Sequence, residues 1–183
     1  PFGAISDKSQ IFQLITALKN ETPVIEILAP SFLGQFGPSV TQNKLATDLK
    51  KLGFTKVSEV AVGADLCASE EAKDFFQTVP EEQPFMATSC CPSWIMMVNR
   101  EYPELADKIS MTLTPMVLTA RLEKEKNPGS KIVFICPCSA KKLEASSKTI
   151  RSDVDFVITF EELMAMFDAK EIVLEDLEEG EYF

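Results

Sequence analysis

The chain has 183 residues, 45% apolar and 25% charged, a composition ordinary for a globular domain. Its 28 acidic residues outnumber 18 basic ones, and the net charge of -10 disfavours nucleic acid or an anionic membrane as main partner. The lack of histidine excludes His-based triads, His general bases and His-ligated zinc or haem. No apolar run reaches 18 residues, so no membrane span is expected.

Apolar periodicity predicts helices and strands that alternate along the chain. In chain order, we expect a helix at Ile11–Leu18, a strand at Val24–Leu28, a helix at Gln42–Leu52 capped by Gly53, a strand at Lys56–Val62, a helix at Glu70–Thr78, a strand at Phe85–Ser89, a helix opening at Pro92, a helix at Pro115–Lys126, a strand at Lys131–Ile135, a helix at Ala140–Ala145, a strand at Phe156–Thr159 and a helix at Phe160–Phe167. This alternation predicts an α/β fold, a parallel sheet with helices on both faces. The acidic tail over residues 171–183 is expected to be poorly ordered.

The five cysteines are the chain's soft metal ligands, and four of them form the tight pairs Cys90–Cys91 and Cys136–Cys138. An odd count in this arrangement is unlike a secreted disulfide framework and favours reduced cytoplasmic thiols or metal ligands. Parallel sheets carry their sites outside the carboxyl ends of the strands. The segments Ala29–Ser31, Thr88–Trp94 and Cys136–Lys141 all follow expected strands, so the paired cysteines are expected at that edge.

The cysteines have two interpretations, metal ligands or buried small hydrophobes. Cys67 has no partner nearby, and we expect it to be a core residue. Adjacent side chains diverge, so Cys90 and Cys91 suggest one ligand and one thiol with another task. Cys91 precedes Pro92 at a helix N-terminus, which favours a thiolate or an anionic cluster. Cys138 is likewise expected at the start of a helix.

Lys141 and Lys142 follow the second cysteine pair, where lysines are ordinarily solvated surface charges. Lys141 lies one turn past Cys138, so its ammonium can reach an anion held by that cysteine. Lys142 points about 100° away around a helix and is expected to behave as a surface charge.

Glu71 and Asp74 lie one turn apart on an expected helix. Two carboxylates at this spacing usually mark a solvated face, and that is the simpler interpretation. Trp94, Met96 and Met97 follow the first cysteine pair, and we expect them to pack into the core from their helix.

Longer motifs around the cysteines resemble one family. Thr88–Trp94 (TSCCPSW) resembles the first signature motif of the large subunit of iron-iron (FeFe) hydrogenases, and Pro137–Glu144 (PCSAKKLE) resembles the second. Further similar segments are Tyr102–Leu105, Asp153–Asp155, Thr159–Leu163 and Pro1–Ile5, the last resembling residues that follow a ferredoxin-like module. The resemblance covers nearly the whole chain. It implies that residues 1–183 are the N-terminal part of a catalytic domain that binds the H-cluster, a 4Fe-4S cubane joined to a two-iron subsite.

The resemblance implies roles for residues in both motifs. Cys91 and Cys138 match two cysteine ligands of the cubane. Cys90 matches the cysteine that passes protons to the bridging amine of the two-iron subsite, and Lys141 the lysine that hydrogen-bonds a cyanide there. Ala29–Ser31 (Ala29, Pro30 and Ser31) resembles the segment that lines the two-iron unit.

Two matched positions depart from the family pattern. Glu71, Asp74 and Ser110 match a proton pathway, in which Asp74 replaces the usual Glu and shortens the reach. Cys136, next to Pro137 in the cofactor-binding segment, stands where many members carry Met or Gly.

The family's third motif, with two further cysteines, and its ferredoxin-like cysteines do not occur in these 183 residues. Two of four cluster ligands are therefore present, and the chain alone is expected to lack a complete H-cluster and activity. The opening Pro1–Ile5 without Met suggests a piece of a longer protein.

The resemblance implies that the parent protein, from an anaerobe, catalyses reversible cleavage of H2 into protons and electrons. Its expected partners are ferredoxin-type electron carriers or attached iron-sulfur modules, and hydrogenase maturation proteins. The alternative is a non-catalytic or H2-sensing iron-sulfur module, which the Cys136 departure favours. A thiol redox protein is disfavoured because no Cys-x-x-Cys motif is present.

Overall fold

The computed structural model describes residues 8–148 and 150–174. Within them, four strands form one parallel sheet in the order β2-β1-β3-β4. The strands are β1 (Val24–Leu28), β2 (Lys56–Glu59), β3 (Lys131–Cys136) and β4 (Phe156–Thr159). The expected parallel α/β fold is confirmed.

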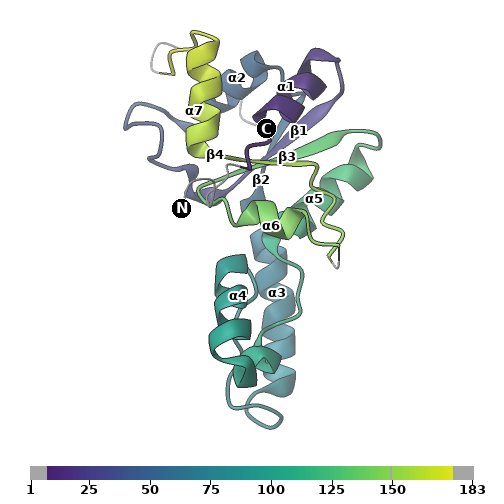
Figure 1. Ribbon diagram of the computed structural model, residues 1–183. Coiled ribbons are helices and arrows are strands. Elements are labelled where there is room, and N and C mark those ends of the chain that lie inside the picture. The colour runs from purple at the N-terminus through teal and green to yellow at the C-terminus, as the bar shows by residue number, and fades with distance from the viewer. Residues whose placement is uncertain (1–7, 149, 175–183) are drawn as a thin grey trace, which may run out of the picture.

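Helices cover both faces of this sheet, as expected. The helices are α1 (Ile11–Lys19), η1 (Pro30–Phe32), α2 (Gln42–Leu52), α3 (Val60–Thr78), α4 (Pro92–Glu101), η2 (Pro103–Lys108), α5 (Pro115–Lys126), α6 (Lys141–Ala145) and α7 (Phe160–Ala169), where η denotes a 3-10 helix. Figure 1 shows α1, α2 and α7 on one side of the sheet and α5 and α6 on the other. The helix pair α3 and α4 extends away from the sheet on the side of α5 and α6.

The strand register assigns side chains to the two faces. Lys56 and Ser58 of β2 both donate hydrogen bonds to Glu123 of α5, so their face is the one that α5 covers. Strand side chains alternate, and Glu26 of β1 pairs in register with Val57. Glu26 therefore points into the opposite layer.

The two central strands are buried along almost their whole length because helices cover both of their faces. Every residue of β1 is buried, and in β3 only the first residue, Lys131, is exposed. Strands buried on both faces have sequences that are almost continuously apolar, and β1 and β3 are therefore well predicted from the sequence. The predicted cap at Gly53 is also confirmed, with φ of 106° in the left-handed region.

The predicted strand at Lys56–Val62 and the helix at Glu70–Thr78 are partly wrong. β2 ends at Glu59, and α3 begins at Val60, ten residues before the predicted start. The early start of α3 is accompanied by a close contact between helices, because α3 packs on α5 at Gly63. A Cβ atom on Gly63 would lie 2.1 Å from Thr119 Oγ1. Gly63 thus serves a helix contact that short-range periodicity does not show.

The predicted strand at Phe85–Ser89 is absent from the described sheet. Ala87 forms an isolated parallel bridge with Ile109, and Phe85 is 44% exposed. The segment belongs to the connection between α3 and α4, which lie away from the sheet (Figure 1). Among the described residues this bridge is the segment's one strand-like pairing, so the segment joins no sheet.

The expectation that Trp94, Met96 and Met97 pack into the core is also wrong. These side chains are 40%, 58% and 41% exposed, and Val98 is the one buried residue of α4. The reason is the position of α4, which packs on η2 and α6 rather than on the sheet.

In the described part of the acidic tail, Leu174 is buried in the hydrophobic core and Ile172 packs against that core. The rest of the predicted tail, 175–183, and the opening segment Pro1–Ile5 lie outside the described residues.

Candidate functional site

Two of the three predicted segments lie together at the carboxyl edge of the sheet. Ala29–Ser31 follows β1 and Cys136–Lys141 follows β3, the strand next to it. The Ala29 amide donates to the Ile135 carbonyl at 2.9 Å, which extends the ladder beyond β1. Ala29 is buried, whereas Pro30 and Ser31 are exposed at the start of η1.

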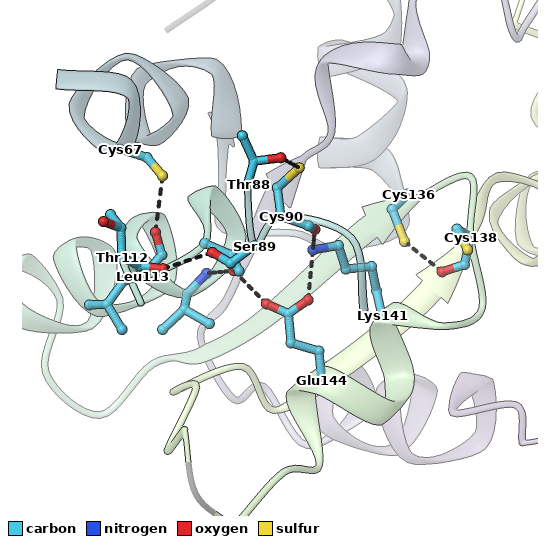
Figure 2. A network of polar contacts seen from close by, with 12 residues as sticks. Cys67, Thr88, Ser89, Cys90, Thr112, Leu113, Cys136, Cys138, Lys141 and Glu144 are labelled. Carbon is cyan, nitrogen blue, oxygen red and sulfur yellow. Dashed lines mark hydrogen bonds and ion pairs between the residues drawn. The ribbon is translucent and has the colours of Figure 1, made fainter. Parts of the chain in front are cut away.

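The third segment, Thr88–Trp94, comes from the α3–α4 helix pair rather than from a sheet strand. It still meets the second motif, because Lys141 Nζ donates to the Cys90 carbonyl at 2.7 Å. Figure 2 shows this contact between residues 51 positions apart in the chain. This contact joins the first motif to the second, although the first motif approaches from outside the sheet and not from the end of a strand, as the sequence predicts.

Lys141 is held by a second bond within α6. Its ammonium donates to Glu144 Oε2 at 2.6 Å, and Glu144 is buried. The other carboxylate oxygen of Glu144 accepts a bond from the Thr114 hydroxyl. Charge-assisted bonds are roughly twice as strong as neutral ones, so the ammonium is well fixed in front of Cys90 (Figure 2).

Cys90 and Cys91 are both exposed. Cys91 is the N-cap residue of α4, with Pro92 at the first helical position, as predicted. The positive end of the helix dipole lies there, a position that suits an anionic ligand. Cys90 Sγ lies 3.9 Å from the Thr88 hydroxyl.

The second pair contains one exposed and one buried thiol. Cys138 is exposed, whereas Cys136 is 1% exposed and donates from Sγ to the Cys138 carbonyl at 3.4 Å. Burial raises the pKa of the Cys136 thiol to about 11, so it is protonated at neutral pH. Cys138 lies three residues before α6, because a turn closed by the Lys141 amide precedes the helix. The prediction that Cys138 begins the helix is therefore wrong, and Pro137 between the cysteines is exposed.

Cys67 is a buried residue of α3, as predicted. Its thiol donates to the Leu113 carbonyl at 3.1 Å. Burial raises the pKa of the Cys67 thiol, and the negative charge of Glu71 raises it further.

The predicted proton-pathway residues lie on α3 and on the segment before α5. Asp74 is exposed, Glu71 is half-buried and Ser110 is buried. The Thr112 hydroxyl donates to Asp74 Oδ2 at 3.3 Å, and the Thr112 amide donates to Ser110 Oγ at 3.1 Å. Asp74 and Ser110 are thus both bonded to Thr112. No hydrogen bond of the Glu71 side chain is found among the described residues.

Lys142 is not the surface charge that the sequence predicts. It is 6% exposed, and Nζ donates to Glu162 Oε1 at 2.7 Å and to Oε2 at 2.9 Å. Because α6 lies between the site and β4, the side chain that points away from the site points into the protein rather than into solvent.

Sequence reasoning assigned no roles to Glu144, Thr114 and Thr112. The spacing of Lys141 and Glu144, three residues on a helix, is a signal that could have found the first. Thr114 is recognisable as an N-cap before Pro115, but its bond to Glu144 spans 30 residues. Thr112 carries no local signal.

The exposed sulfurs of Cys91 and Cys138 are soft donors suited to an iron-sulfur cluster. A cubane takes four thiolates, so these two fit part of a ligand set. Within the described residues, no group of three or more Cys, Asp or Glu side chains is placed to hold a metal ion. Cys91 and Cys138 are thus suited in chemistry to be two of the four thiolate ligands of a cubane.

The family described as "Iron only hydrogenase large subunit, C-terminal domain" matches residues 22–183. The chain belongs to this family. Iron hydrogenase 1 of Clostridium pasteurianum is 34% identical to this hydrogenase-family domain over 99% of the chain and 35% of the relative. A probable cytosolic Fe-S cluster assembly factor of Aedes aegypti is 33% identical over 72% of the chain and 31% of the relative.

Solved structures agree with this assignment. The FeFe-hydrogenase HydA(deltaEFG), from work on stepwise H-cluster assembly, superposes with a TM-score of 0.83 at 32% identity, over 96% of this chain and 50% of that chain. A variant of apo FeFe-hydrogenase HydA1 from Chlamydomonas reinhardtii gives 0.82 at 30% identity, over 96% and 51%. The hydrogenase-family domain thus spans about half the length of these solved chains and about a third of the curated relatives above.

None of the helices in residues 8–148 and 150–174 combines the length and the apolar character needed to cross a membrane.

Proposed function

We propose that this domain is the first part of an FeFe-hydrogenase catalytic domain in a protein that interconverts H2 with protons and electrons. One contact carries the proposal. Lys141 Nζ donates to the Cys90 carbonyl and so joins the two motifs, in which the thiols of Cys90, Cys91 and Cys138 are exposed. The 34% identity to iron hydrogenase 1 over nearly the whole chain supports it.

In this proposal Cys91 and Cys138 bind a 4Fe-4S cubane, and further ligands come from outside these 183 residues. When bound, the H-cluster supplies the redox chemistry that splits H2. Ala29–Ser31 and Cys136–Pro137 form the neighbouring wall, since they end adjacent strands. Lys141 orients anionic groups on the two-iron unit through its charge.

Cys90 holds the proton nearest the reacting group, and its exposed thiol suits that role. Away from it, Ser110 is buried, Glu71 is half-buried and Asp74 is exposed. Asp74 is thus the most exposed of these three residues, which supports its place as the outer member of a proton path that leads to Cys90.

The test is an H2 evolution assay on the full-length cytoplasmic protein, supplied with reduced ferredoxin, before and after treatment with hydrogenase maturation proteins. We expect activity that depends on maturation. A matured protein with an intact H-cluster spectrum and no H2 evolution would refute the catalytic proposal.

A second candidate is a non-catalytic or H2-sensing iron-sulfur module. The specific observation in its favour is Cys136, a protonated, buried thiol beside the cluster ligands. The similarity to an Fe-S cluster assembly factor points the same way. A bound cubane without a two-iron unit in the purified full-length protein would favour this candidate.

A further inference from the structure

Thr112 lies in the segment between η2 and α5 and makes three hydrogen bonds to residues of the candidate site. Its hydroxyl donates to Asp74 Oδ2 at 3.3 Å, and its amide donates to Ser110 Oγ at 3.1 Å. Its carbonyl accepts a bond from the Ser89 hydroxyl at 3.0 Å, shown in Figure 2. One residue thus bonds to the exposed carboxylate of α3, to a buried serine and to the residue next to Cys90.

We propose that Thr112 is a positioning residue for proton transfer, which aims the Asp74 carboxylate at the path through Ser110. The proposal rests on the proposed function, because it concerns the proton path of the same site. It adds a residue for which the sequence motifs provide no role.

The geometry explains why such a residue is needed. Asp74 is exposed, so its short side chain would otherwise choose among rotamers in solvent. The bond across 38 residues from Thr112 selects one of them. Thr112 is itself held by two backbone bonds, of which the one from the buried Ser89 fixes it relative to the cysteine motif.

Ser110 is oriented by the same residue. Its oxygen accepts from the Thr112 amide, which leaves the Ser110 hydroxyl hydrogen free to donate onward. Thr112 therefore has one side-chain contact and two backbone contacts, and these can be separated by mutation. Thr112→Val keeps the shape and both backbone bonds but loses the donor to Asp74.

The experiment compares four variants in the full-length matured protein: Thr112→Val, Thr112→Ser, Asp74→Asn and the double variant of Thr112→Val with Asp74→Asn. The control is Thr47→Val, another half-buried threonine, whose hydroxyl donates to the Asn43 carbonyl of α2. The readouts are the H2 evolution rate, its solvent deuterium isotope effect, the infrared spectrum of the H-cluster and the crystallographic rotamer of Asp74.

We expect Thr112→Val to lower the rate by about tenfold and to raise the isotope effect, with an unchanged infrared spectrum. Thr112→Ser should stay within about twofold of wild type, since it keeps the hydroxyl. The double variant should be no slower than Asp74→Asn alone, because both changes break the same link. In crystals of Thr112→Val, Asp74 should occupy other rotamers.

An active wild type with equal rates and isotope effects in Thr112→Val would overturn the inference and leave the proposed function standing. Additive losses in the double variant would overturn it too, since the two residues would then act separately. An inactive matured wild type would refute the proposed function, and the inference would fall with it. An unmoved Asp74 side chain in Thr112→Val would overturn the positioning role whatever the activity.

Discussion

The buried ammonium of Lys142 bonds to both carboxylate oxygens of Glu162, at 2.7 and 2.9 Å, and so ties α6 to the N-terminus of α7. Glu162 also accepts from the Thr159 amide at 2.7 Å and completes the capping box of α7. The helix that carries Lys141 toward the site is therefore anchored on its other side by the next residue in the chain.

Loss of this ion pair should destabilise the fold. Lys142→Met leaves a half-buried carboxylate without its cation, and breaking such a pair costs about 3 kcal/mol. We expect a lower free energy of unfolding by about 2 to 3 kcal/mol in urea titrations. Lys148→Met, an exposed lysine just beyond α6, should change it by less than about 0.5 kcal/mol. Equal small effects of both changes would contradict the anchoring role.

The same pair shows where sequence prediction succeeds and fails. Helical geometry correctly predicts that the side chains of Lys141 and Lys142 point about 100° apart around the helix axis. It does not predict which parts of the protein the two side chains face. Helix α6 has five residues and lies between the site and β4, so Lys141 points toward the site and Lys142 points into the protein. The strands β1 and β3 were predictable because apolar runs between helix layers have few alternative structures.

The parts that were not predictable depend on contacts between distant residues. The first turns of α3 pack closely on α5, where Gly63 approaches Thr119, 56 positions later. The resemblance to the family motifs identifies Cys90 and Lys141 as site residues. It does not predict that the Lys141 ammonium donates to the backbone carbonyl of Cys90. Thr112 has no local sequence pattern, since the role we propose for it depends on its bond to Asp74 of α3.

Asp48 of α2 provides a prediction on pH. It is buried, and neither carboxylate oxygen has a hydrogen-bond partner among the described residues. Burial raises its pKa from 3.8 to about 6, although Lys51 and Lys44 lower it. The unfolded chain therefore loses this proton at lower pH than the folded one, so stability falls as pH rises from about 4 to 6 and is then constant.

Asp48→Asn should remove the loss of stability that accompanies ionisation of Asp48. We expect it to raise the free energy of unfolding at pH 7 by about 1 to 2 kcal/mol and to leave it nearly unchanged at pH 4. Urea unfolding at both pH values measures this. Asp168→Asn, an exposed aspartate at the end of α7, should show no such pH-dependent gain. A destabilised Asp48→Asn at pH 7 would show that the carboxylate is satisfied in solution.

The adjacent cysteines should separate in their effects on the full-length protein. Cys91→Ala should abolish cubane incorporation, because a ligand at the N-terminus of α4 is lost. Cys90→Ala should keep the cluster but slow H2 turnover by about a hundredfold or more, because the proton donor is removed. Iron content and electron paramagnetic resonance measure the first, and H2 evolution the second. Equal cluster loss in both variants would contradict this division of roles.

Lys141 should be needed for the two-iron unit rather than for the cubane. Lys141→Met keeps the length of the side chain and removes the charge, so the bonds to the Cys90 carbonyl and Glu144 are lost. In the full-length matured protein, we expect infrared bands of the two-iron unit to fall several-fold while the cubane signal persists. Lys148→Met is the control, since the ion pair of Lys142 makes that neighbour unsuitable.

A structural role for the Lys141–Glu144 pair must be separated from a role toward the bound group. Among the described residues, Lys141→Met alone leaves the buried Glu144 carboxylate with the Thr114 hydroxyl as its one partner, which destabilises the fold whatever the ammonium does at the site. The double change of Lys141→Met with Glu144→Gln removes both charges. It should restore much of the unfolding free energy but not the two-iron bands, because the ammonium that faces the anionic ligands is still missing. Recovery of the bands together with stability would show that Lys141 acts only through Glu144.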